Sequence, residues 1–429
     1  MFKKHRFLPL IALVLLMLTV TSCAQNGESA APADSVGIQQ GADEQNVQSN
    51  AQNSPVPITH ITYTDTLGKW AAGDNGVYVL QDVFPAGVNI LYIDLATKQE
   101  IFLCAAPNCK HNTPDCTSYL PLEEKEYAYC IAYFRDAIYL IQCATAAKQP
   151  PHISRMEKDG SGLQDVCFLN KGENFTGKLF GYGDDEILIE TTYVSENKQS
   201  GKRLERINCS TGERNVVVEY PNDSYYGLMA AVDNKLAFIK INETGNQYFW
   251  VNPSSSNISL EECAETAPIG TLFDDKTTTY TIQGDYLCKV STESKELLAE
   301  NLITGQMYEF RYPDDSMNFD WLVLTQVFDD NFALTTSNPE GNMIQILLDS
   351  ETGELTDKIY AITKTNAHQI VASFGDWIVQ YIRADERLLE NQAEYGLSGE
   401  TCYFDVFGIA TKEEFLQDTG GTEVSVPAV

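Results

Sequence analysis

The sequence predicts an all-β fold, a β-propeller of seven four-stranded antiparallel blades, with six or eight blades as the alternatives. Three observations lead to this prediction. Short β-rich runs separated by turn residues begin at about residue 57, long helical periodicity is nearly absent, and a unit of about 50 residues recurs. Residues 57–429 divided by seven give about 53 residues per unit, which suits the four strands of a blade.

Each unit opens on a turn residue followed directly by an alternating apolar run, as in Asp233–Ile239. A second hairpin with a Gly or Asp turn follows most of these runs, as in Ile207–Gly212. Two hairpins per unit give four strands, and the regular spacing favours a propeller over a β-sandwich or a solenoid. The turn aspartates are Asp74, Asp136, Asp185, Asp233, Asp285, Asp330 and Asp376.

The sequence also predicts the structure of two further segments. Ile58–Tyr63 alternates apolar and polar residues before the first unit. Because an unpaired edge strand invites aggregation, we expect this segment to pair with the last blade and close the ring. Asp385–Tyr395 is the one plausible helix, and we expect it to interrupt the seventh unit as a long excursion.

The N-terminus predicts export and lipidation. Three basic residues precede the apolar run Leu10–Leu18, which is too short to span a bilayer but fits a secretory signal. The run ends in Val-Thr-Ser-Cys, which resembles the bacterial lipobox and implies that Cys23 is lipidated. A plain secretory signal with an incidental cysteine is the alternative. We therefore expect a signal peptide over 1–22, a lipidated flexible tether over 23–56 and the propeller over 57–429.

The charge balance excludes some partners. Sixty acidic and 29 basic residues give a net charge of −31. Such a surface repels phosphate backbones and anionic headgroups, which argues against a nucleic-acid partner and against membrane binding through basic residues. We expect contact with the cell membrane through the lipid anchor alone, on its extracytoplasmic face, and a glycan, peptide or protein as ligand.

The sharpest local motif has the spacing C-x4-C-x-H-x4-C, formed by Cys104, Cys109, His111 and Cys116. Three thiols and one imidazole suit a tetrahedral zinc site. Because all four ligands would come from the protein, such a zinc would be structural. A disulfide between two of the cysteines and free thiols are the alternatives. The loop 104–116 falls in the longest gap between units, so we expect an insertion between the first two blades.

Together with the lipobox and the repeated units, this motif resembles the uncharacterised β-propeller-type lipoproteins of anaerobic Firmicutes. The resemblance covers most of the chain. It implies a propeller fold and a position outside the cytoplasm, at the cell membrane. It implies no particular activity.

The other polar residues and motifs of the sequence identify no catalytic residue. Paired acids such as Asp184-Asp185 fall where turns are expected, and Cys130 and Cys143, in neighbouring strands, are candidates for a bridge. G-x-S-x-G, H-E-x-x-H and phosphate-binding glycine loops are absent from the sequence. We therefore expect a binding module. The alternative is a carbohydrate-active or peptidase-type enzyme on the propeller, for which converging carboxylates would be evidence.

Overall fold

The chain divides into two compact units, Met1–Ser54 and Pro55–Val429. The predicted signal peptide and Cys23 lie outside the residues that this computed structural model describes. No helix in the described part of the chain is long and apolar enough to cross a bilayer. The described residues are 55–61, 67–83, 87–121, 128–143, 150–195, 197–221, 226–242, 245–255, 257–269, 278–291, 296–310, 322–328, 331–337, 343–349, 352–353, 355–362, 369–388, 401–417 and 421–425.

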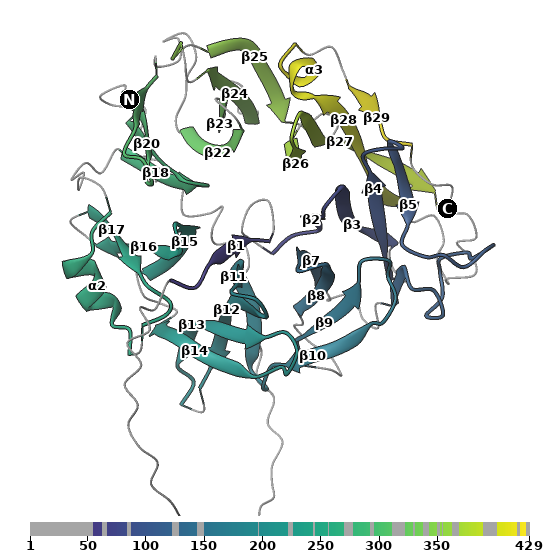
Figure 1. Cartoon of the computed structure of the whole chain (residues 1–429), viewed down its shortest axis with the longest axis horizontal. Coiled ribbons are helices and arrows are strands. Elements are labelled where there is room, and N and C mark those ends of the chain that lie inside the picture. The colour runs from purple at the N-terminus through teal and green to yellow at the C-terminus, as the bar shows by residue number, and fades with distance from the viewer. Residues whose placement is uncertain are drawn as a thin grey trace, which may run out of the picture. The chain divides into compact units, whose positions relative to one another are not determined.

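The second unit is an all-β propeller whose antiparallel sheets follow one another along the chain (Figure 1). The first sheet contains β2 (Trp70–Ala72), β3 (Gly76–Val83), β4 (Gly87–Asp94), β5 (Gln99–Phe102) and β6 (Tyr119–Pro121). The second contains β7 (Ala128–Phe134), β8 (Ala137–Cys143), β9 (His152–Glu157) and β10 (Gln164–Phe168). The third contains β1 (Ile58–His60), β11 (Glu173–Tyr182), β12 (Glu186–Val194), β13 (Ser200–Asn208) and β14 (Arg214–Pro221).

The C-terminal half continues the pattern. The fourth sheet contains β15 (Tyr226–Val232), β16 (Lys235–Asn242) and β17 (Gly245–Val251). The fifth contains β18 (Thr278–Gln283), β19 (Tyr286–Ser291), β20 (Glu296–Asn301) and β21 (Met307–Glu309). The sixth contains β22 (Leu322–Phe328), β23 (Asn331–Ser337), β24 (Met343–Asp349) and β25 (Leu355–Ile362). The seventh contains β26 (Gln369–Phe374), β27 (Trp377–Leu388), β28 (Thr401–Thr411) and β29 (Thr422–Glu423).

The prediction of seven four-stranded blades is wrong, and the alternative of six such blades matches the described strands. Six sheets have at least four described strands, but the fourth has three. After β17 the chain forms helix α2 (Leu260–Thr266), which packs on β17. Only an isolated bridge between Phe249 and Pro268 follows it. The helix therefore takes up the residues that would have formed the outer strand.

Six of the seven predicted turn aspartates lie one or two residues before a strand, and Asp330 lies outside the described residues. Two of these turns have positive φ at both central residues: 52° and 58° at Arg135-Asp136, and 45° and 61° at Asp233-Asn234. Turns of this kind match the right-handed twist of paired strands. The strand predicted after each turn is confirmed at all seven places, as β3, β8, β12, β16, β19, β23 and β27.

Four of the outer hairpins share a five-residue turn of form Asp/Asn-x-x-Thr-Gly/Lys. The first carbonyl accepts a hydrogen bond from the N–H of the fifth residue, at 2.8 or 2.9 Å. The fifth residue has φ between 55° and 72°, which favours glycine. The first side chain accepts further bonds from the turn, as at Asn208. These turns are Asp94–Lys98, Asn208–Gly212, Asn301–Gly305 and Asp349–Gly353.

The predicted ring closure is wrong. β1 pairs with the inner strand β11 of the third sheet, not with the last sheet, and Ile58 lies opposite Tyr182. The seventh sheet takes all its strands from the C-terminal part of the chain, so it needs no N-terminal strand. Instead, the first and seventh sheets pack face to face in one apolar cluster, in which Val79 and Ile93 meet Val379 and Ile409.

The predicted helix Asp385–Tyr395 is also wrong over its described part. Asp385 to Leu388 belong to β27, and residues 389–395 lie outside the described residues. Arg383 binds Asp385 of the same strand at 2.7 Å and Glu423 of β29 at 2.9 Å. The sequence did not predict α2 or α3 (Lys412–Gln417), which are short, and α3 follows β28 directly.

Candidate metal centre

The Cys/His loop lies inside the outer strand of the first sheet, not between two blades as predicted. β5 pairs with the second half of β4, and β6 pairs with its first half. Between them, the Ile90 N–H donates to the Ser118 carbonyl at 2.7 Å, and the Ile90 carbonyl accepts from the Leu103 N–H at 3.0 Å. Both ends of the loop are therefore fixed on one strand.

The structure brings the four predicted ligands together. The sulfur atoms of Cys104, Cys109 and Cys116 and a ring nitrogen of His111 all lie within 4.8 Å of one another. His111 Nδ1 is 3.3 Å from Cys116 Sγ, and the His111 main-chain N–H donates to Cys109 Sγ at 3.4 Å. Tetrahedral zinc with Zn–S bonds of about 2.3 Å separates its sulfur ligands by roughly 3.8 Å, so only small movements would be needed.

The surroundings of the cluster suit a metal that binds thiolate and neutral imidazole. Burial lowers the pKa of His111, and its ring stacks on Phe102 with centroids 4.0 Å apart. Burial acts to raise the pKa of Cys104, but hydrogen bonds from the Ala106 main chain and the neighbouring thiols outweigh it and lower that pKa. Burial raises the pKa of Cys116 to about 12. A dication would favour its deprotonation, as in other thiolate sites.

The described cysteines all carry free thiols in the structure. A disulfide between any two cysteines of the cluster would remove two of the four donors. The free-thiol arrangement keeps the complete donor set in one place. It is therefore the state in which a Cys₃His site can form.

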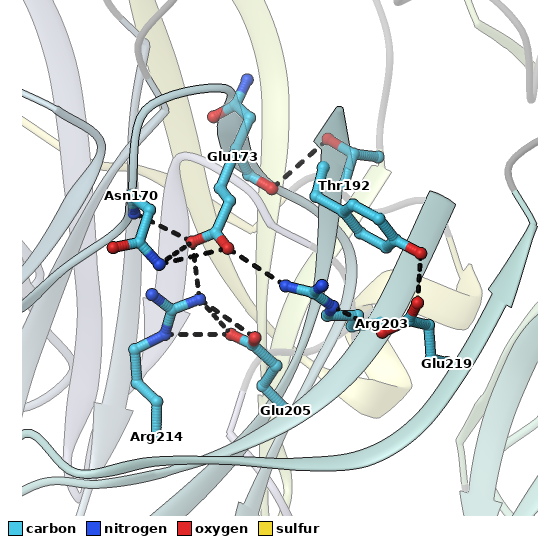
Figure 2. Close-up of polar contacts among 9 residues, drawn as sticks. Asn170, Glu173, Thr192, Arg203, Glu205, Arg214 and Glu219 are labelled. Carbon is cyan, nitrogen blue, oxygen red and sulfur yellow. Dashed lines mark hydrogen bonds and ion pairs between the residues drawn. The ribbon is translucent and has the colours of Figure 1, made fainter. Parts of the chain in front are cut away.

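A second polar cluster was not predicted, because its members come from distant parts of the third sheet. Figure 2 shows Glu173 between two guanidinium groups, at 2.8 Å from Arg214 and 3.1 Å from Arg203. Arg214 also binds Glu205, and Arg203 binds Glu219, each at 2.8 Å. These residues lie on β11, β13 and β14, so only the cross-strand register brings them together.

The cluster lowers the pKa of two of its carboxylates. Burial acts to raise the pKa of Glu173, but hydrogen bonds from the Asn170 N–H and from Arg214 outweigh it and lower that pKa. Likewise, hydrogen bonds from Tyr193 and Arg203 lower the pKa of Glu219 against the effect of burial. A general acid needs a raised pKa, so this cluster lacks the property that glycoside cleavage requires of its acid.

The other acid pairs and histidines that the structure describes do not converge on one site. Asp184 and Asp185 lie in a turn, as predicted, and Asp184 pairs with Arg135 at 2.6 Å. His60 lies exposed on β1, and His152 lies buried on β9. The acid pairs at 274–275, 314–315 and 329–330, His368 and the side chain of Cys402 lie outside the described residues.

No protein-family model matches the chain, and no curated protein matches it. Among solved structures, an oligogalacturonate lyase in complex with manganese matches 84% of this chain and 92% of its own at 10% identity, with a TM-score of 0.44. An oligogalacturonate lyase from Vibrio parahaemolyticus matches 76% of this chain and 88% of its own at 9% identity, with a TM-score of 0.44. An acylaminoacyl peptidase from Pyrococcus horikoshii matches 80% and 57% at 9% identity, with a TM-score of 0.41. No activity is transferred from structures this distant.

Proposed function

We propose that this protein is a lipid-anchored, extracytoplasmic propeller that binds a glycan, peptide or protein ligand, with a structural zinc centre in its first blade. The observation that carries the zinc assignment is the convergence of four donors from Cys104, Cys109, His111 and Cys116 within 4.8 Å. The lipobox-like Val-Thr-Ser-Cys before the tether supports the anchor at Cys23. We also propose that the three-stranded fourth sheet is a seventh blade, reduced at its outer edge.

The zinc would stabilise the blade and would not catalyse. Four protein ligands complete a tetrahedral shell and leave no position for water or substrate. The loop replaces the middle of the outer strand, where β4 would otherwise have a continuous partner. A metal there would hold the loop ends together and so preserve the pairing of β5 and β6 with β4.

Binding is favoured over catalysis by the state of the buried carboxylates. Glu173 and Glu205 converge on Arg214, but each forms an ion pair with that guanidinium. Propellers bind ligands through loops on a rigid scaffold, and loop residues carry the specificity. The negative surface would favour neutral or cationic ligands.

Elemental analysis tests the zinc centre. The full chain, purified in detergent without added metal, should contain one zinc per chain, and Cys109→Ser should lose it. Cys263→Ser is the matched control, because Cys263 is a half-buried cysteine on α2, outside the cluster. Zinc retained equally by both variants, or absent from the wild type, would contradict the assignment.

Two further experiments test the anchor and the ligand. Cys23→Ser should move the protein from the membrane fraction to the soluble fraction and abolish labelling by an alkyne fatty acid. A Ser22→Ala change that leaves the cysteine in place is the control. Glycan and peptide arrays probed with the full chain should give selective binding, whereas turnover of an arrayed substrate would favour the enzyme alternative.

A further inference from the structure

The second sheet carries a pair of thiols that the proposed function does not use. Cys130 lies on β7 and Cys143 on β8. In the register of these strands, Cys130 is opposite Ile141 and Cys143 is opposite Ala128. The two cysteines are therefore offset by two residues, so their side chains leave the same face of the sheet as diagonal neighbours.

The pair is accessible and chemically unequal. Both side chains are partly buried at the edge of the apolar cluster between the second and third sheets. Contact with Cys143 lowers the pKa of Cys130, and the nearby charge of Lys69 acts in the same direction. Contact with Cys130 and burial raise the pKa of Cys143. One thiol is thus disposed to act as the thiolate, and the other to stay protonated.

The structure assigns Cys130 and Cys143 as a redox-active dithiol that closes into a cross-strand disulfide by exchange with a low-molecular-weight disulfide. The Cys130 thiolate attacks one sulfur of the reagent, forming a mixed disulfide and releasing one thiolate. Cys143 then loses its proton to solvent and attacks the Cys130 sulfur, which forms the protein disulfide and releases the second thiolate. The protein loses two electrons and two protons, and the reagent is reduced to two thiols.

The register also predicts that this disulfide is readily reduced. Diagonal Cα atoms across an antiparallel pair are about 7–8 Å apart, whereas a disulfide needs about 7 Å or less. Closure therefore requires a small shift of β7 against β8. A strained disulfide is reduced more easily than a relaxed one.

Four described cysteines outside the candidate metal centre differ from this pair. Cys167, Cys209 and Cys288 are fully buried in apolar clusters. Their pKa values are raised by burial, to about 11 for Cys167 and about 12 for Cys209 and Cys288. Cys263 is partly buried and stands on α2, away from the second sheet. Reaction at these positions should be slow or should stop at a single adduct.

Peptide mapping tests the proposal without reference to zinc or to the anchor. Trypsin places the two cysteines on separate peptides, Glu126–Arg135 and Asp136–Lys148, each with one cysteine. The full chain in detergent is treated with oxidised glutathione, the remaining thiols are alkylated, and the digest is analysed by mass spectrometry. The expected product is the two peptides linked, with a mass two hydrogen atoms below their sum, and dithiothreitol should restore both alkylated peptides.

Variants separate exchange from chance oxidation. Cys143→Ser should trap glutathione on Cys130 and give no linked peptides, and Cys263→Ser should give the wild-type result. Circular dichroism confirms that each variant is folded. Recovery of both wild-type peptides as separately alkylated species, or as stable glutathione adducts, would overturn the proposal.

Discussion

Replacing Arg214 by methionine should destabilise the protein strongly at neutral pH. Its guanidinium donates to both Glu205 carboxylate oxygens, at 2.8 to 3.1 Å, and to Glu173 at 2.8 Å. The two glutamate side chains are only 3% and 9% exposed. Methionine fills part of the space but leaves the buried Glu205 carboxylate without its cation, and Glu173 keeps only Arg203. Breaking a buried pair in this way costs about 3–5 kcal/mol of unfolding free energy.

The matched control is Arg203→Met. Arg203 is 23% exposed, its partner Glu219 is 47% exposed, and Glu173 keeps Arg214 in this variant. An exposed pair contributes about 0–1 kcal/mol, and the stacking of Arg203 on the Tyr193 ring at 3.8 Å adds about 0.5–1 kcal/mol. We therefore expect Arg203→Met to cost about 1–2 kcal/mol.

The pH dependence gives a second measurement on the same variants. The pKa of Glu173 is lowered in the folded state, so its contribution to stability is present above the unfolded pKa and is lost as the pH falls through the folded pKa. The deficit of Arg214→Met should therefore shrink in acid, because protonation removes the uncompensated charges. Adding Glu205→Gln should likewise restore part of the loss at neutral pH.

Urea unfolding followed by circular dichroism, at pH 7 and at several acidic values, measures all these differences. Similar losses for Arg214→Met and Arg203→Met would refute the reasoning. So would an Arg214→Met deficit that stays constant as the pH is lowered.

Three other outcomes follow from the structure. Gly305 and Gly212 occupy the same turn position, with φ of 72° and 71°. A Cβ added to Gly305 would meet nothing within 4 Å, whereas a Cβ added to Gly212 would lie 2.1 Å from a main-chain oxygen. We expect Gly305→Ala to cost about 1–2 kcal/mol, and Gly212→Ala about 1–3 kcal/mol more, and equal thermal shifts would contradict this. Cys116→Ser should abolish binding of the proposed zinc and increase proteolysis of the loop at 104–116. Chelation of the wild type should do the same, and limited digestion measures both effects. Tyr220→Phe removes a hydrogen bond to the buried Glu190 and should lower the free energy of unfolding in urea by about 1–3 kcal/mol. An unchanged free energy of unfolding would contradict this prediction.

Local patterns account for what the sequence could predict. The turn before each second strand depends on neighbouring residues, as at Asp233-Asn234, where both residues adopt positive φ. The Cys/His motif was also predictable, because its ligands lie within 13 residues of one another. Its location was not, since β6 returns to β4 through pairing that no local pattern records.

The wrong predictions concern features that are determined by contacts between distant parts of the chain. The alternation of apolar and polar residues from Ile58 predicts a strand, but it does not indicate which sheet edge the strand joins. Nothing in the sequence of β11 marked it as the partner. The charges from Asp385 onward fit a helix surface by composition, yet the start of this segment pairs with β28 as part of β27. The Glu173 cluster joins residues 41 positions apart, so no spacing rule identifies it.

The junction between the first and last sheets has a consequence for how the ring assembles and opens. No strand ladder of the described residues crosses it apart from the bridge between Gln99 and Ser425, and the contact consists mainly of apolar side chains. During synthesis the ring can therefore close only when the C-terminal residues have left the ribosome. At the other junctions the chain itself runs from one sheet to the next, whereas here it does not. Under strain, the ring can therefore separate at this junction while the ladders within each sheet stay intact, so the N- and C-terminal sheets suit new chain ends or covalent reinforcement.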